Sequence, residues 1–178
     1  MACRFINEGN RELISIEDTN FHWTPNFAGD PSKSNVGSTE RNGALIIPET
    51  EFAQILADKG VTVKYKSNDD IDNSMPSEDW DGDLKSPHFF AYIKANYGED
   101  DWRNPKIYIV RNNHPRLLSE DELKELDINP SSIIRVNALL SPYSSDRFKN
   151  KTTLYIRTMY VEVNDETDPY YGRYDWDE

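Results

Sequence analysis

Two expected strands place an aromatic ring and a cation two residues apart. Tyr92 and Lys94 occur in HFFAYIKANY, and Tyr155 and Arg157 occur in TTLYIRTMYVEV. Because side chains two apart on a strand point to the same side, each strand would present a ring and a positive charge together. Rings stack on nucleobases and cations follow phosphates, so this pairing predicts binding of single-stranded nucleic acid. The alternative is that amphipathic Tyr and Lys side chains only shield apolar surface on a solvated strand face.

Further rings and cations lie on the faces or beside the ends of other expected strands. Lys64 and Lys66 share one face of the alternating stretch VTVKYK. We expect the sheet face to contact the nucleic acid through Tyr92, Lys94, Tyr155 and Arg157, and the phosphates to meet Lys64, Lys66, Arg111 and Arg135. The additional stacking candidates are Trp23, Phe27 and Tyr108.

The sequence lacks the common signatures of catalysis and of cofactor binding. His22, His88 and His114 stand apart from one another and from Cys3, without a metal-ligand spacing. There is no GxxxxGK[ST], GxGxxG or GxSxG motif. The acidic residues fall mostly in expected loops, where they cannot hold metal ions in a fixed geometry. We therefore expect a protein that is not an enzyme and that uses no cofactor or metal.

Charge is distributed unevenly along the 178 residues. The net charge is −12, yet residues 67–84 carry seven acids and no base, and residues 165–178 carry six acids and one base. The remainder of the chain is therefore neutral and can present a basic surface, although nucleic-acid binders are usually basic overall. We expect residues 67–84 to form an acidic flexible loop, since they combine high charge with few apolar residues.

The expected elements are short strands with two short helices. Apolar or alternating runs predict strands at 13–16, 44–47, 61–66, 88–97, 106–110, 133–140 and 152–163. Pro48 and Gly60 bracket an amphipathic helix, and Ser119 and Glu122 form a capping box at the start of another. No alternation of strands and helices spans the chain, so the pattern favours a small barrel or sandwich. The predicted core residues are Phe52, Ile55, Ile93, Ile107, Ile109 and Ile156, an assignment from alternation that one β-bulge would invert.

The order of several segments resembles a family of phage-encoded single-stranded-DNA-binding proteins. The segments are NFAG (26–29), an Arg-Asn pair (41–42), ETEFAQILADKGVTVKYK (49–66), NPKIYIV (104–110), LLSEDELKELD (117–127), IIRVNALLSPY (133–143) and TTLYIRTMYVEV (152–163). The resemblance implies an OB fold: a mainly β, five-stranded barrel, here with additional strands and two short helices. It also implies nonspecific binding of single-stranded DNA in phage replication or recombination.

The last fourteen residues, 165–178, form a separate acidic and aromatic tail after a domain that spans 1–164. The tail ends in Tyr174, Asp175, Trp176, Asp177 and Glu178, and it resembles the tails of phage and bacterial single-strand binders. Such a tail can compete with DNA for the protein's own binding surface and can recruit replication or recombination proteins. A plain solubilising role is the alternative.

The sequence also indicates the cellular compartment in which the protein is expected. No apolar run approaches the roughly 20 residues of a membrane-spanning helix, and the N-terminus has no signal-peptide pattern. The lone Cys3 fits a reducing compartment, so we expect a cytoplasmic protein, in the host cell if the chain is phage-encoded. A homodimer remains open.

One rival function is an acidic DNA mimic, an anti-defence protein that blocks a DNA-binding partner. The other is a structural module with no role in nucleic-acid binding.

Overall fold

The computed structural model describes residues 2–33, 37–66, 78–98, 104–144 and 151–164. Within these residues the fold is mainly β, as predicted, and nine strands form one sheet that is not closed. The strands are β1 (Cys3–Glu8), β2 (Arg11–Thr19), β3 (Asn42–Ile47), β4 (Lys64–Lys66), β5 (His88–Lys94), β6 (Lys106–Arg111), β7 (His114–Leu117), β8 (Ile133–Ser144) and β9 (Thr152–Val163). The helical segments are η1 (Pro31–Lys33), α1 (Thr50–Asp58), η3 (Glu120–Leu126) and η4 (Pro130–Ser132).

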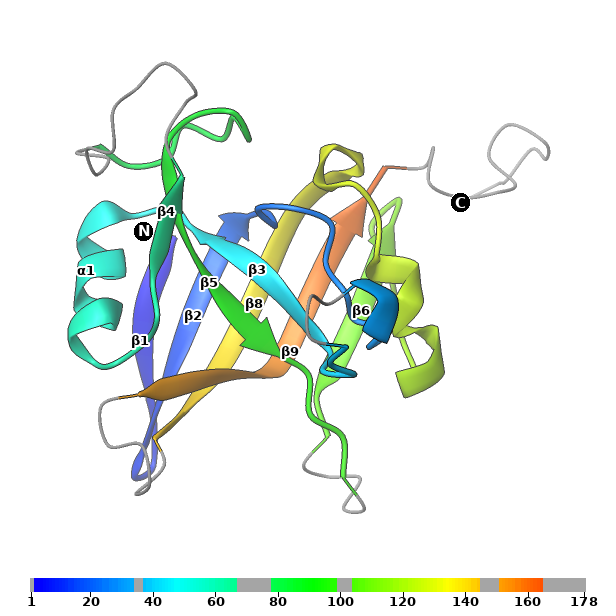
Figure 1. Cartoon of the computed structure of the whole chain (residues 1–178), viewed down its shortest axis with the longest axis horizontal. Helices are drawn as coiled ribbons and strands as arrows, with labels where there is room; N and C mark the ends of the chain where they lie inside the picture. The colour runs from blue at the N-terminus through cyan, green and yellow to red at the C-terminus, as the bar shows by residue number, and fades with distance from the viewer. Residues whose placement is uncertain (1, 34–36, 67–77, 99–103, 145–150, 165–178) are drawn as a thin grey trace.

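Strand β9 is the branch point of the sheet. The main strand order is β1-β2-β8-β9-β5-β3, with β4 added to β5, and with β6 and β7 added beside the second half of β9. β9 pairs antiparallel with β8 along its length, and parallel with β5 and then β6 on its other edge. Figure 1 shows that β3 and β5 cross in front of β2 and β8, so the sheet folds back on itself. Buried side chains from both layers fill the space between them.

A β-bulge changes which residues of β9 face the core. Thr158 pairs with Leu139 and Ile156 pairs with Leu140, so Arg157 is the extra residue. Before the bulge the even-numbered residues of β9 are buried, and after it the odd-numbered ones are, from Met159 to Val163. Such bulges bend a strand, and Figure 1 shows β9 turning sharply near the end of β5.

The segment after β2 runs along the free edge of β3. Phe21 and Asn26 form isolated antiparallel bridges with Leu45 and Asn42. The backbone N–H of His22 donates to the carbonyl of Ala44 at 2.7 Å. Residues 20–26 therefore cover β3, the outer strand of the main order, and the chain leaving β2 returns to the far end of the sheet.

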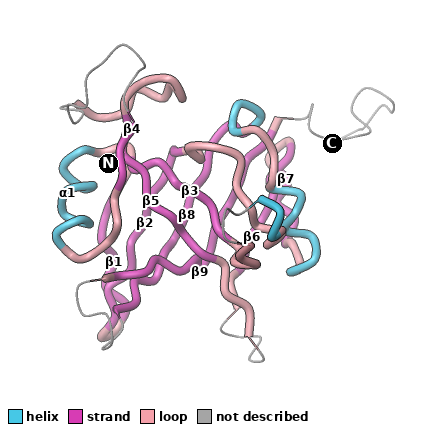
Figure 2. The backbone as a smooth tube through the Cα atoms, viewed as in Figure 1, coloured by secondary structure: helices cyan, strands magenta, loops and turns pink. Residues whose placement is uncertain are grey.

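The helical segments cover the two ends of this folded sheet, as Figure 2 shows. α1 packs Phe52 against Phe5 of β1, with ring centroids 4.8 Å apart. The capping box expected at Ser119 and Glu122 is present, although the helix that follows it is a 3-10 helix. Of the predicted core residues, Phe52, Ile93, Ile107, Ile109 and Ile156 are buried, whereas Ile55 is only half-buried.

Three features of the fold differ from the sequence-based expectation or extend it. The expected strand at 13–16 is the middle of β2, which pairs with the unpredicted β1 in a hairpin. A further unpredicted strand, β7, pairs with β6. The described part of the acidic loop, residues 78–84, is anchored to the start of α1: the N–H of Trp80 donates to Pro48 O and that of Thr50 to Asp79 Oδ1.

No helix in the described ranges has both the length and the apolar character needed to cross a membrane.

Candidate nucleic-acid interface

Strand β5 divides its side chains between the core and the outer face of the sheet. Phe89, Ala91 and Ile93 belong to the core cluster. Because successive side chains of a strand alternate, Tyr92 and Lys94 must point to the opposite, outer face. The predicted alternation of this strand is confirmed.

Strand pairing brings two more of the predicted residues to this outer face. Lys64 of β4 lies opposite Phe90, and Tyr155 of β9 lies beside Lys94. Paired residues on adjacent strands point to the same side of a sheet, and the strands are about 4.8 Å apart. The Lys64 ammonium lies 5.7 Å from the centroid of the Tyr92 ring. Lys64, Tyr92, Lys94 and Tyr155 therefore form a continuous array across three strands.

Trp23 extends this array at the edge of the sheet. It follows His22 in the segment that covers β3, and 49% of its surface is exposed. Its ring lies 6.3 Å from Tyr92 and 5.8 Å from Phe90. We call Trp23, Lys64, Tyr92, Lys94 and Tyr155 the outer strip.

A layer of rings beneath Trp23 holds this end of the outer strip in place. His22 stacks on Phe90 with 3.9 Å between centroids and 7° between planes. His22 Nδ1 lies 2.8 Å from His88 Nε2, and His88 Nδ1 lies 2.7 Å from the carbonyl oxygen of Ser86. Since a carbonyl can only accept, His88 Nδ1 carries a proton, and Nε2 of a neutral His88 accepts from His22. These contacts fix the ring that precedes Trp23.

The electrostatics of the outer strip combine cations, a neutral phenol and one carboxylate. Burial raises the pKa of Tyr92, so its hydroxyl is uncharged at neutral pH and does not repel a phosphate. The Lys94 ammonium, however, pairs with the carboxylate of Glu40 at 2.6 Å. A phosphate that contacts Lys94 would therefore have to displace Glu40.

A groove of about 490 Å³ lies at the Trp23 end of the outer strip. Trp23 and Tyr92 line it together with Asn26, Lys33 and Asn42. Three polar side chains of this groove already have partners: Asn26 Nδ2 donates to Asp30 O, Asn42 Nδ2 donates to Glu40, and Lys33 lies 4.0 Å from Asp127. Its rings are therefore better placed than its polar groups to contact a ligand.

Phe27 is not available for stacking, so this expectation was wrong. Its side chain is fully buried and packs edge-on against Phe21, with 5.6 Å between centroids. The N–H groups of Phe27 and Ala28 donate to the Asp127 carboxylate at 2.7 and 2.9 Å. Burial raises the pKa of Asp127, while these two hydrogen bonds and the nearby cations act in the opposite direction. The loop at 26–29 thus serves to anchor the segment that carries Trp23.

Arg157 and Arg135 lie outside the outer strip. Arg157 occupies the bulge and pairs with Glu8 at 2.7 Å. Arg135 pairs with Glu162 at 3.1 Å and lies 3.9 Å from Asp18. Carboxylates therefore partly neutralise both guanidinium groups.

Tyr108 and Arg111 lie on β6, beside the second half of β9. Tyr108 stacks on Tyr160 with 4.6 Å between centroids, so one face of its ring is covered. Arg111, at the end of β6, is half-buried. They therefore lie beside the part of β9 that follows the bulge, whereas Tyr155 of the outer strip lies before it.

The remaining predicted residues are Lys66 and five residues of the acidic tail. For Lys66 only the pairing of its backbone with His88 is described. Tyr174, Asp175, Trp176, Asp177 and Glu178 lie outside the described residues.

Sequence reasoning missed several residues that shape this surface. Phe90 shares the alternation of Tyr92 and could have been found from it, whereas His22 and Glu40 reach the outer face from loops. Asp127 follows the capping-box helix, and no local signal links it to Phe27, which is 100 residues away.

No family model matches the chain, and no curated protein or solved structure with significant similarity was found. The described residues contain no group of three or more His, Cys, Asp or Glu side chains arranged to hold a metal ion.

Proposed function

We propose that the protein binds single-stranded DNA along the outer strip, without sequence preference there. The observation that carries this proposal is the convergence of Trp23, Tyr92 and Tyr155 with Lys64 and Lys94 on one face of the sheet. Rings can stack on any base because every base has a flat face, and the cations follow the phosphates. Binding of this kind keeps a single strand extended and protected.

The proposed fold and biological role are finer statements than the mainly β architecture. The pairing of residues 20–26 with β3 supports an OB-type barrel. These residues directly follow β2, which lies near one end of the strand order, whereas β3 lies at the other end. The resemblance of the segment order supports a role in phage DNA replication or recombination. In this proposal the acidic tail, residues 165–178, competes with DNA for the outer strip and recruits partner proteins once it is displaced.

The test is a titration of labelled oligo-dT with the protein. Binding is measured by the tryptophan fluorescence of the protein and by the fluorescence anisotropy of the label. Binding should quench tryptophan and weaken with salt, with a log–log slope of about −0.7 for each neutralised phosphate. Trp23→Ala and Tyr155→Ala should each cost about 1–3 kcal/mol of binding free energy. Tyr160→Ala is the matched control, since Tyr160 is 39% exposed and lies outside the outer strip. Equal losses in all three variants would show that the outer strip is not the contact surface.

An acidic DNA mimic is the second candidate, favoured by one observation. Asp79, Asp81 and Asp83 are exposed in the segment that precedes β5, and the whole chain carries a net charge of −12. Such a mimic would leave oligo-dT unbound at every salt concentration. The same titration therefore separates the two functions.

A further inference from the structure

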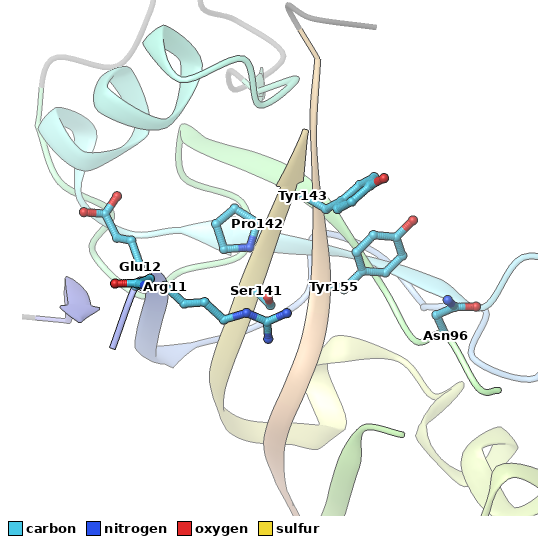
Figure 3. A pocket seen from close by; sticks show the side chains of 8 residues that line it. Arg11, Glu12, Asn96, Ser141, Pro142, Tyr143 and Tyr155 are labelled. Carbon is cyan, nitrogen blue, oxygen red and sulfur yellow. The ribbon is translucent and has the colours of Figure 1, made fainter. Parts of the chain in front are cut away.

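A second groove lies at the far end of the outer strip, next to Tyr155 (Figure 3). Its volume is about 550 Å³, and it lies between β8, β9 and the start of β2. Tyr143 and Tyr155 form an aromatic wall, with ring centroids 6.4 Å apart and planes at 64°. Tyr143 is 60% exposed, which is the highest value among the large hydrophobic side chains in the described residues. An exposed ring beside a groove offers a stacking surface to a flat ligand.

Arg11 and Asn96 supply hydrogen-bond donors to this groove. Arg11 begins β2, and Asn96 follows β5 two residues after Lys94. Within the described part of the chain, neither side chain makes a hydrogen bond or an ion pair. Glu12, which also lines the groove, is paired with Lys59 at 3.3 Å. In the groove beside Trp23, by contrast, Asn26, Asn42 and Lys33 are already engaged.

The combination of an aromatic wall with a guanidinium and an amide selects a class of ligand. A single-stranded base that leaves its neighbours can stack on a tyrosine and be hydrogen-bonded along its edge. The planar fork of arginine donates two parallel hydrogen bonds, and guanine presents two adjacent acceptors, O6 and N7, that match it. Figure 3 shows the Arg11 side chain extending toward Ser141, while Tyr143 and Tyr155 lie beside one another.

We propose that this groove holds one guanine base of the bound strand, stacked on the tyrosine wall and read by Arg11. The inference rests on the proposed function and deepens it: the outer strip binds any sequence, and the groove adds a preference at a single nucleotide. The groove adjoins Tyr155, which is shared by both surfaces, so a strand lying along the outer strip can place its next base in the groove.

The test compares oligo-dT with the same oligonucleotide carrying one central guanine or one central adenine. The wild-type protein should bind the guanine oligonucleotide about tenfold more tightly than oligo-dT. Arg11→Lys keeps the positive charge but loses the two-pronged fork. It should retain the affinity for oligo-dT and lose most of the guanine preference. Arg4→Lys is the control, because Arg4 belongs to a surface ion pair with Glu17, and it should keep the preference.

A second arm uses mononucleotides, so that the groove can be judged apart from strand binding. Saturable binding of dGMP, with shifts in the ring resonances of Tyr143 and Tyr155, supports the groove even if oligo-dT does not bind. Oligo-dT binding without any guanine preference overturns the groove and leaves the proposed function standing. A preference that survives in Arg11→Lys overturns the role of Arg11. If inorganic phosphate displaced dGMP from the groove as effectively as dGMP itself does, the groove would be an anion site and the assignment to a base would be overturned.

Discussion

The ion pair between Lys94 and Glu40 limits how strongly the outer strip attracts a phosphate. Lys94 stands between Tyr92 and Tyr155, and its ammonium lies 2.6 Å from the Glu40 carboxylate. The two side chains are 30% and 43% exposed, so the pair contributes only about 0–1 kcal/mol to folding. Glu40→Gln removes the competing charge while keeping an amide oxygen for Asn42. We therefore expect tighter DNA binding with little change in stability.

The size of this effect follows from counterion release. If Glu40→Gln allows one more phosphate to be neutralised, the log–log salt slope steepens by about 0.7. If the additional contact contributes nothing at about 1 M salt, affinity rises about eightfold at roughly 0.05 M and about threefold at roughly 0.2 M. The ratio between variant and wild type must therefore fall as salt rises.

The assay is fluorescence anisotropy of labelled oligo-dT over this range of salt concentrations. Glu125→Gln is the matched control, since it removes a charge from another exposed ion pair, with Arg116 of β7, away from the outer strip. It should change affinity less and leave the slope nearly unaltered. Equal effects of the two substitutions would mean that only net charge matters, and a loss of affinity in Glu40→Gln would refute the placement of DNA beside Lys94.

Further expectations concern the buried thiol, the loop anchor and the tail. Burial raises the pKa of Cys3 from 9.0 to about 12, so the unfolded chain loses this proton first as pH rises. The contribution of the protonated Cys3 thiol to the free energy of unfolding is complete below about pH 9 and is lost as the pH rises from about 9 to 12. Between pH 9 and about pH 10.5 the free energy of unfolding of the wild type, measured with urea, should fall by about 2 kcal/mol more than that of Cys3→Ala. Free energies that change with pH in parallel for the two proteins would contradict this. Asp127→Ala leaves the partly buried N–H groups of Phe27 and Ala28 without their acceptor, so urea unfolding should show a loss of about 1–3 kcal/mol and oligo-dT titration should show weaker binding. A free energy of unfolding within about 0.5 kcal/mol of wild type would refute the anchoring role. Deleting residues 165–178 should tighten oligo-dT binding at low salt and matter less at high salt, whereas an unchanged affinity would remove the tail as a competitor.

The alternation within β5 could be read from the sequence because it depends only on the two-residue period of a strand. Phe89, Ala91 and Ile93 are apolar and Lys94 is charged, so polarity distinguishes the core face of β5 from its outer face. The capping box at Ser119 was predictable for a similar reason, since its two partners are three residues apart.

The neighbours of each strand could not be derived from local patterns. The parallel pairing of β5 with β9 brings Lys94 beside Tyr155, although nothing near either residue specifies the other. The bulge at Arg157 exchanges the buried and exposed positions of β9, which a strict period of two does not anticipate. Phe27 was expected to stack on a base, yet a distant carboxylate, Asp127, binds its backbone N–H and its ring is buried in the core.

The most direct test of the outer strip is ultraviolet crosslinking of the full-length protein to oligo-dT, with the crosslinked residues mapped by mass spectrometry. Aromatic side chains that stack on bases should crosslink first, so the account predicts adducts at Trp23, Tyr92 and Tyr155. Adducts confined to Tyr108 and Tyr160, or a crosslinked fraction that does not fall with rising salt, would contradict it.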